Sequence, residues 1–377
     1  MISQLTALCL VFGCGVLFLI PVRHAAARAW ILAALNLLFL KLLISGQNLI
    51  WVIALVALIC LLLKAVSAAA WRIPAACILA AGTLGLFLFH KLPAIQGVSG
   101  KTVLAAVGFS YVALRIVDLL RAVFEKRYPA PGLTATINYL LPFHMLLAGP
   151  IQSYDDYARQ PAVPSPVTRA GALRAAERIA HGAFKKFVLA LIIQKLFLTD
   201  FQSHGWRFLL EAQAFYIWLY LDFSGLSDIA VGIGGLLGLQ TPENFNRPYL
   251  ARNMINFWER WHISLSQFIR ANLYIPIQLR LVRWTLGRYA LWCASIAFVI
   301  SFALCGLWHG ISPRYLIWGL LNALGLLITN IYRHYLTRYL GAKGVKRYLA
   351  NQPIRVCATI VTFEFVAFSL ALLQEPL

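Results

Sequence analysis

The sequence predicts an all-α protein that crosses a membrane many times. Hydrophobic residues make up 61% of the 377 residues and charged residues only 12%. The mean hydropathy of +0.75 is far above that of a soluble globular domain. The apolar residues gather into runs of about 17–25 residues, the length that a helix needs to span a bilayer. Repeats of about 20–50 residues are not visible, so we expect one integral membrane domain over residues 1–377.

Roughly ten or eleven apolar runs are expected to be transmembrane helices. They lie near residues 4–22, 28–45, 47–63, 73–90, 103–124, 133–152, 187–199, 206–221, 288–308, 311–331 and 354–373. The run at 133–152 ends in the helix-breaking "AGP" and precedes a stretch, 153–186, that is rich in Arg and Lys. Strict alternation would place that basic stretch outside. We therefore expect 133–152 to enter and leave the membrane on one side, sheltered by other helices.

Positive charges predict the orientation of the chain. No Lys or Arg precedes the first run, whereas Arg23 and Arg28 follow it. The positive-inside rule therefore places the N-terminus outside the cytoplasm. The same order of charges argues against a signal peptide cleaved at "AAARA" (25–29). The formal net charge of +20 is large even for a membrane protein, and part of it would attract an acidic partner.

Several chemistries are disfavoured. The seven cysteines lie in or beside apolar runs without CxxC or Cys/His ligand spacing, so neither a disulfide framework nor a metal site is expected. No soluble basic module with a nucleic-acid-binding motif is visible. A secondary transporter would also carry acids within its helices, but it should show paired inverted repeats, and none is visible.

Two acids lie within the apolar stretch 219–250. Asp222 and Asp228 stand six residues apart in "LDFSGLSD". A charge at the centre of a bilayer costs about 3 kcal/mol or more unless it is paired, so such acids are candidates for function. A structural hydrogen-bonded cluster is the alternative. Neither Ser224 nor Ser227 meets the G-x-S-x-G pattern of a nucleophile elbow.

The stretch "NFWERWHISLSQFIRANLYIPI" (256–277) is polar for this chain. Its apolar residues recur every three or four positions, which predicts an amphipathic helix that Pro276 would end. Such a helix would lie at the membrane interface or wall a polar tunnel. A simple interfacial anchor is the alternative, and His262 favours chemistry only slightly.

A second histidine, His309, lies in "ALCGLWHGISPRYLIWG" (303–319) between Gly306 and Gly310, at the junction of two apolar runs. An imidazole titrates near neutrality and is a natural general base. A capping or interfacial histidine is the alternative. The remaining histidines have weaker contexts: His24, His90, His144, His181, His204 and His334.

Taken together, these motifs resemble the membrane-bound O-acyltransferase family. The resemblance is carried by "DFSGLSD", "PENFNRPY", "FWERWHISLSQFIRANLYIP" and "GLWHG", in this order and spacing. Upstream, "GFSYVALRIVDLLR" (108–121), "LPFHMLLAGPIQSY" (141–154) and "GAFKKFVLA" (182–190) are similar to its bacterial branch, which includes the lipoteichoic acid D-alanyl transferase and the alginate O-acetyltransferase. The similarity covers about residues 100–320.

The resemblance implies a bundle of helices around a central tunnel, with re-entrant and amphipathic helices. An acyl group would pass from a thioester donor to a hydroxyl, with no bound cofactor. The donor would be a phosphopantetheine thioester on a carrier protein, or acetyl-CoA. His309 matches the catalytic histidine of the family and His262 its second marked position. Tunnel-lining or supporting roles are expected for Asp222, Ser224, Asp228, Asn244, Asn246, Trp258, Arg260, Trp261 and Trp308.

The resemblance also implies a setting, the bacterial cytoplasmic membrane. The chain ends soon after "TFEFVAFSLALL" (362–373), which suits the shorter D-alanyl transferase type. We therefore expect D-alanyl transfer to a hydroxyl of an extracytoplasmic envelope polymer or partner protein. Alginate-type O-acetylation is the alternative, and a transporter or an assembly scaffold is a more distant one. Glu364 matches no family pattern.

A basic helix face is a candidate docking site. Arg169, Arg174 and Arg178 would share one face of a helix, and Lys185 and Lys186 extend it. In this family setting we expect the face to bind an acidic acyl carrier protein on the cytoplasmic side. Binding of anionic lipid headgroups is the alternative. A membrane-anchored or extracytoplasmic acyl-relay protein is a further expected partner, and no nucleic acid is expected.

Overall fold

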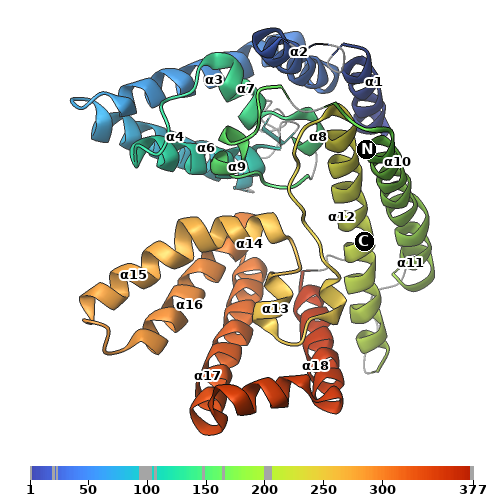
Figure 1. Cartoon of the computed structure of the whole chain (residues 1–377), viewed down its shortest axis with the longest axis vertical. Coiled ribbons are helices and arrows are strands. Elements are labelled where there is room, and N and C mark those ends of the chain that lie inside the picture. The colour runs from blue at the N-terminus through green and yellow to red at the C-terminus, as the bar shows by residue number, and fades with distance from the viewer. Residues whose placement is uncertain are drawn as a thin grey trace. The chain divides into compact units, whose positions relative to one another are not determined.

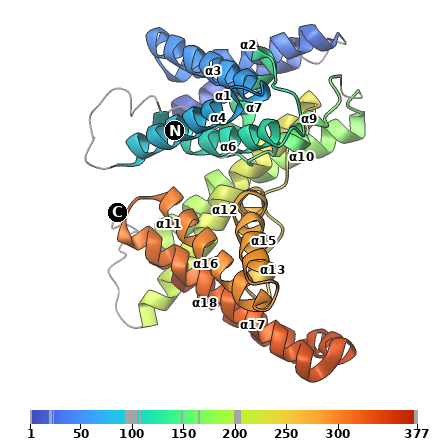
Figure 2. The ribbon, with the colours of Figure 1, turned by 90° about the vertical axis from the view of Figure 1, so that its left-hand side faces the viewer.

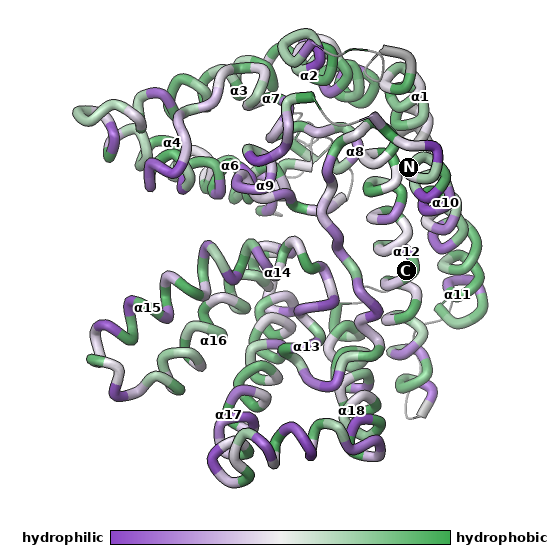
Figure 3. The backbone as a smooth tube through the Cα atoms, viewed as in Figure 1, coloured by the Kyte–Doolittle hydropathy of each residue, from purple (hydrophilic) through white to green (hydrophobic). Residues whose placement is uncertain are grey.

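The computed structural model describes residues 2–18, 22, 24–92, 104–105, 108–146, 149–163, 166–198 and 206–373. Over these residues the regular elements are helices, and the β pairing consists of one isolated bridge between Phe245 and Trp261. The prediction of an all-α protein is therefore confirmed. Figure 3 shows hydrophobic residues along most helices and hydrophilic ones on the segment that follows α12.

Seven of the described helices are long and apolar enough to cross a membrane. They are α2 (Ala25–Leu43), α3 (Gly46–Ser67), α4 (Arg72–Lys91), α12 (Trp206–Leu237), α16 (Ala290–His309), α17 (Pro313–Ala350) and α18 (Gln352–Ala371). The number is smaller than the count of predicted runs because α1 (Ile2–Phe18) and α6 (Phe109–Phe124) are shorter, the run at 133–152 is broken, and the run at 187–199 falls on the short helices η2 (Lys185–Leu189) and α11 (Ala190–Phe197). The chain is an integral membrane protein.

The chain folds as two compact units. Unit 1 comprises residues 1–182 and 226–242, and unit 2 comprises residues 183–225 and 243–377. Helix α12 therefore contributes to both units, passing from unit 2 to unit 1 after Gly225. The single domain over residues 1–377 and its central tunnel stay predictions.

Unit 1 contains α1 to α4, α6 and a set of shorter helices (Figure 1). The shorter ones are α7 (Leu133–Leu140), α8 (Phe143–Leu146), α9 (Tyr154–Ala158) and most of α10 (Arg169–Phe184). Side chains cap two of its long helices, since His24 accepts from the Ala27 N–H and Ser45 from the Asn48 N–H.

The run at 133–152 is not one helix. It stops after Leu140, ahead of the predicted "AGP". The fully buried Arg115 donates to the carbonyl oxygens of Leu140 (3.1 Å) and Pro150 (3.2 Å). A buried carbonyl without a donor is costly, so Arg115 stabilises the irregular backbone between α7 and α9. Entry and exit on one side of the membrane stays a prediction.

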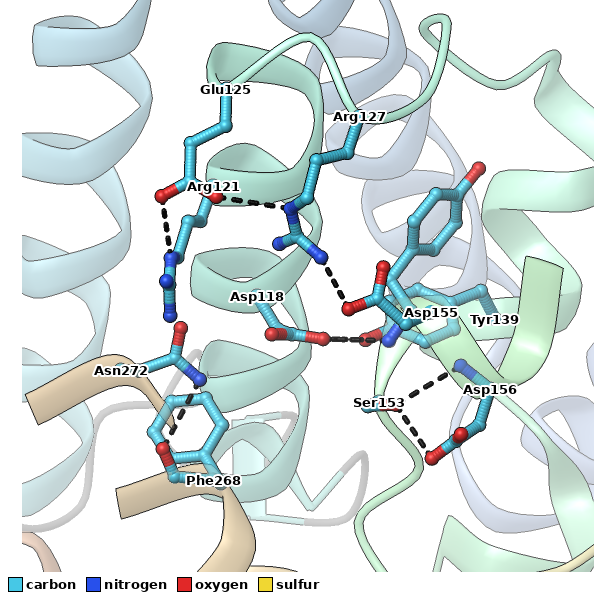
Figure 4. Close-up of polar contacts among 11 residues, drawn as sticks. Asp118, Arg121, Glu125, Arg127, Tyr139, Ser153, Asp155, Asp156, Phe268 and Asn272 are labelled. Carbon is cyan, nitrogen blue, oxygen red and sulfur yellow. Dashed lines mark hydrogen bonds and ion pairs between the residues drawn. The ribbon is translucent and has the colours of Figure 1, made fainter. Parts of the chain in front are cut away.

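Polar contacts join α6 to the start of α9, as Figure 4 shows. The Asp118 carboxylate accepts from the Tyr154 N–H at 2.6 Å and from the Tyr139 hydroxyl at 3.4 Å. Arg127 bridges Glu125, at 3.0 Å, and Asp155. These contacts fix the turn after α6 within unit 1.

Arg28 is a buried capping residue rather than a charge in an aqueous loop. Its guanidinium donates to the Leu237 carbonyl at 2.6 Å, at the C-terminal end of α12, where a positive charge also suits the helix dipole. This contact weakens the argument from positive charge for the orientation of the N-terminus. Arg23, the other residue in that argument, lies outside the described residues. The orientation stays a prediction.

Unit 2 contains the longest helices of the chain (Figure 1). It begins with η2 (Lys185–Leu189), α11 (Ala190–Phe197) and α12 up to Gly225, and it continues with η3 (Pro248–Leu250), α13 (Met254–Trp258), α14 (Ile263–Ile269), η4 (Arg270–Tyr274), α15 (Ile275–Trp284) and α16 to α18. Helix α17 bends at Gly341, whose φ of 65° favours glycine. Figure 2 shows the same helices in a second view.

The prediction of one continuous amphipathic helix over 256–277 is wrong in two places. The chain leaves the helix after Trp258 and re-enters it at Ile263, and His262 between them has a φ of 43°. Pro276 does not end the helix, which runs on to Trp284. The π-helical turn η4 explains this, because the Ile275 N–H bonds to the Arg270 carbonyl, five residues back, next to the position where proline has no N–H to donate.

Among the described elements, helices α16 and α17 form the most extensive helix pair. They approach at Gly306 and Gly319, where an added Cβ would fall inside van der Waals contact of the carbonyl oxygens of Tyr315 and Phe302. Backbones that pack this closely need small residues. The contact matters for function because His309 lies one turn beyond Gly306.

We predict that Gly306→Ala destabilises the protein by about 1–3 kcal/mol or more, because a methyl group must be forced against backbone. Gly82→Ala is the matched control: it is also in a long helix, but no atom lies within 4 Å of its added Cβ. Thermal unfolding in detergent should show a lower melting temperature for Gly306→Ala and an unchanged or slightly raised one for Gly82→Ala. An unchanged melting temperature for Gly306→Ala would contradict the close approach.

Candidate active site

A short pairing of two extended segments positions His262. The Asn246 N–H donates to the Arg260 carbonyl, and the Ile263 N–H donates to the Asn244 carbonyl, both at 2.9 Å. This pairing surrounds the bridge between Phe245 and Trp261. It holds His262 at the N-cap of α14 in the left-handed region, which is rare for residues other than glycine.

Asn244 completes the cap of α14 with its side chain. Its Oδ1 accepts from the Ser264 N–H (3.3 Å), from the Ser264 hydroxyl (2.8 Å) and from the His262 ring at Nδ1 (3.0 Å). A backbone N–H can only donate, so the atom that it meets is the amide oxygen. His262 Nδ1 therefore carries the proton, and Nε2 carries the lone pair.

Burial keeps His262 neutral. Its side chain is 3% exposed, and burial, followed by the charge of a protonated His309, lowers its pKa from 6.5 to about 3. Since the folded pKa lies below the unfolded one, this group's contribution to stability is present above about pH 6.5 and is lost as the pH falls toward 3. His262 does not change charge at physiological pH.

His309 is the last residue of α16 and is half-buried. Its ring centroid lies 4.7 Å from that of Trp308 and 5.2 Å from that of Trp318, with the rings nearly perpendicular to it. Trp318 in turn contacts Trp258 at 6.1 Å. Successive ring contacts from His309 through Trp318, Trp258 and Phe257 to Trp261 join the two motif histidines in one aromatic cluster within unit 2.

Aromatic rings also pack around His262. Phe223 of α12 meets its ring edge to face at 4.8 Å, and Phe245 packs against Phe223 at 5.0 Å. Trp261 is buried between Phe245 and Phe257. The predicted residue Trp261 therefore belongs to the packing that holds the site.

The predicted residues Asn246 and Arg260 support the turn. The side chain of Asn246 is exposed, and the residue contributes its backbone N–H and carbonyl. Arg260 donates to the Asn246 carbonyl and to the Asn256 side chain, both at 3.2 Å.

Each acid of "DFSGLSD" forms an ion pair. Asp222 pairs with Lys186 in unit 2, and Asp228 pairs with Arg178 at 3.0 Å in unit 1. This favours the structural interpretation of the two acids. The sequence did contain a signal for this pairing. The two acids are six residues apart and the two bases are eight residues apart, and each spacing is about two helical turns.

The pairing corrects the predicted docking face. Lys186 is buried, and Arg178 is engaged with Asp228, so neither is an open contact for a partner. Arg169 and Arg174 are exposed on α10, and Lys185 is half-buried. Among the described residues, the buried Ser224 hydroxyl has no hydrogen-bond partner.

Sequence reasoning missed three residues of the site: Phe223, Ser264 and Trp318. Phe223 and Ser264 lie beside predicted residues in the motifs, and Trp318 lies nine residues after His309 in the quoted stretch "SPRYLIWG". A tryptophan in the second turn of the helix that follows a candidate catalytic histidine was an available signal. Glu364, unassigned from sequence, accepts from Gln213 at 2.8 Å. No cluster of metal-ligating side chains occurs in the described ranges.

The model of the membrane-bound O-acyltransferase family matches residues 39–370. The chain belongs to this family. It is 27% identical over 274 residues to the teichoic acid D-alanyltransferase of Bacillus subtilis (strain 168), covering 70% of this chain and 67% of that protein. It is 29% identical over 278 residues to the probable alginate O-acetylase AlgI of Pseudomonas aeruginosa, covering 72% of this chain and 50% of that protein. The Helicobacter pylori peptidoglycan O-acetyltransferase is 35% identical over 148 residues, 39% of this chain and 25% of that protein. The protein is therefore an enzyme that transfers acyl groups to oxygen.

We predict that Asn244→Ala disrupts the site of this O-acyltransferase. It leaves three buried donors without their acceptor, at about 1–3 kcal/mol each, and frees the His262 ring to take the other tautomer. Asn246→Ala is the matched control, because that side chain is exposed and only its backbone is bonded. Unfolding in detergent and acyl transfer should both suffer in Asn244→Ala and stay near wild type in Asn246→Ala. Equal behaviour of the two variants would contradict the role of the Asn244 oxygen.

Proposed function

We propose that this enzyme transfers an acyl group from a thioester donor to a hydroxyl of a cell-envelope polymer, with His309 as general base. The observation that carries the proposal is that the two motif histidines share one aromatic cluster but lie in unequal environments. His262 is buried and held neutral, whereas His309 is half-buried at a helix end. The more accessible ring is the one that a substrate can reach.

The reaction balances with one proton relay. His309 takes the proton of the acceptor hydroxyl as the oxygen attacks the thioester carbonyl carbon. The new C–O bond forms, the C–S bond breaks, and the imidazolium returns the proton to the leaving thiolate. Each histidine disfavours a charge on the other, so a neutral His262 lowers the cost of charging His309 during the transfer. His262 is a positioning residue, because it acts on the reaction through its neutral charge beside His309 and through the turn that it caps.

The names of the relatives support the choice of acyl group and acceptor. A teichoic acid D-alanyltransferase and a probable alginate O-acetylase each align with about 70% of this chain. We propose D-alanyl as the acyl group. O-acetyl is the second candidate, because the alginate O-acetylase shows the higher identity over similar coverage. The proposed setting is the bacterial cytoplasmic membrane, with the acceptor on its outer side and an acyl-relay protein as partner.

The donor is proposed to arrive on an acidic carrier protein at α10. The exposed Arg169 and Arg174 remain the basic residues of the predicted face that no described ion pair engages. A basic surface steers an acidic partner in a salt-dependent way.

We predict that His309→Ala lowers acyl transfer about 10²–10⁴-fold, since the general base is lost. His334→Ala is the matched control, because His334 is exposed on α17 and outside the site. Both variants should insert at wild-type levels. The acyl content of the extracted polymer, resolved as D-alanyl or acetyl by mass, measures the loss and identifies the group. Wild-type product from His309→Ala would contradict the mechanism, and an acetyl product would select the second candidate.

We predict that changing Arg169 and Arg174 together to Glu weakens transfer from a carrier-bound donor but not from a soluble pantetheine thioester. Arg178 is left intact, because replacing it would break its ion pair with Asp228. The control is Arg333→Glu with Arg338→Glu, an exposed pair of the same spacing on α17. Rates are compared in neutral-lipid liposomes at low and high salt. If carrier-dependent transfer at low salt is unchanged in the α10 variant, the carrier docks elsewhere.

A further inference from the structure

Two buried indole N–H groups in unit 2 have no acceptor among the residues that the structure describes. They belong to Trp258, which is 6% exposed, and Trp318, which is 4% exposed. A buried tryptophan N–H usually finds a partner, and leaving it without one costs free energy. An indole N–H can only donate. The group that completes these two sites must therefore offer a lone pair, which excludes a cation.

One of these rings, that of Trp318, lies beside the proposed general base, and the ring of Trp258 packs against it. Trp318 meets the His309 ring nearly perpendicularly at 5.2 Å, and Trp258 meets Trp318 at 6.1 Å. Trp258 also packs against Phe302 of α16 at 4.9 Å. The two indole rings thus contact each other, and the ring of Trp318 contacts the ring that would activate the acceptor hydroxyl.

The backbone holds these donors in place. Trp318 directly precedes Gly319, where α17 approaches the Phe302 carbonyl of α16 too closely for a side chain. Trp258 is the last residue of α13, and its aromatic contacts reach both long helices. Donors fixed before the substrate arrives need no reorganisation when charge develops, which is the property of an oxyanion hole.

The chemistry of the surroundings selects the acceptor atom. Aromatic side chains line these two N–H groups, and a free anion would lose its hydration there with little return. A thioester carbonyl is neutral when bound and gains negative charge on oxygen only as the hydroxyl attacks. Donors in an apolar setting then stabilise the transition state more than the bound donor.

We infer that Trp318 and Trp258 donate their indole N–H groups to the carbonyl oxygen of the acyl donor and to the oxyanion formed from it. This inference rests on the proposed acyl transfer and adds the groups that bind the reacting oxygen. Attack on the carbonyl carbon moves the C=O π pair onto oxygen, and its return expels the thiolate. The indoles keep their protons throughout.

The kinetic test removes the N–H groups and keeps an aromatic ring at each position. Trp318→Phe and Trp258→Phe should each lower kcat about 10²–10³-fold with little change in KM, as loss of one oxyanion donor does. Trp284→Phe, at an exposed position of α15, is the control and should act as wild type. In a second form, Trp318 is replaced by 3-benzothienylalanine, which keeps the fused ring shape without an N–H. Wild-type kcat in this variant would overturn the proposal for Trp318.

The binding test uses two unreactive probes. S-(2-oxopropyl)pantetheine offers a ketone oxygen close to the position of the thioester carbonyl, and S-propylpantetheine lacks it. Wild type should prefer the ketone about 3–10-fold, and both Trp→Phe variants should lose that preference while binding S-propylpantetheine normally. Retention of the preference in both variants overturns the inference. If wild type transfers no acyl group and binds neither probe, the proposed function fails instead, so the two failures are distinguishable.

Discussion

One oxygen atom, Oδ1 of Asn244, organises the site. The chain breaks between Trp258 and Ile263, and such a break leaves the first N–H groups of the next helix without partners. The backbone and side-chain oxygens of Asn244 accept two of these N–H groups, and Oδ1 also accepts from the ring of His262. The helix start and the histidine tautomer are thus set by the same contact. A change at Asn244 acts on structure and chemistry together.

The same requirement explains buried and half-buried basic residues elsewhere in the described part of the chain. Arg28 and Arg115 donate to carbonyl oxygens at helix ends and breaks, whereas Arg178 and Lys186 form ion pairs with carboxylates on α12. Both solutions satisfy polar groups that an apolar environment cannot solvate. The basic residues of such a chain therefore fall into two groups. Structural ones are bonded and at least half-buried, whereas exposed ones such as Arg174 are open to a partner.

The sequence allowed the prediction of those features that depend on hydrophobic periodicity and motif spacing. It identified the all-α membrane class and the motif histidines, whose sequence contexts match the family. It missed the break before His262, because a left-handed residue capped from eighteen positions upstream leaves no trace in the spacing of apolar residues. It missed the partner of Asp222 for a related reason: Lys186 lies on another helix, and pairing between helices follows from packing. Trp318 was visible as a residue, but its contact with His309 depends on the close approach at Gly319.

The two histidines show how a fold assigns different tasks to one side chain. His262 is enclosed, and its Nδ1–H is committed to Asn244, so burial and the neighbouring charge keep it neutral. His309 lies at a helix end with part of its ring accessible. Electrostatic coupling is reciprocal. A charged His309 opposes protonation of His262, and a charged His262 would oppose protonation of His309 by the same energy. A permanently neutral His262 therefore leaves His309 free to take the proton. In the proposed mechanism, the burial that keeps His262 neutral removes a positive charge that would oppose protonation of His309.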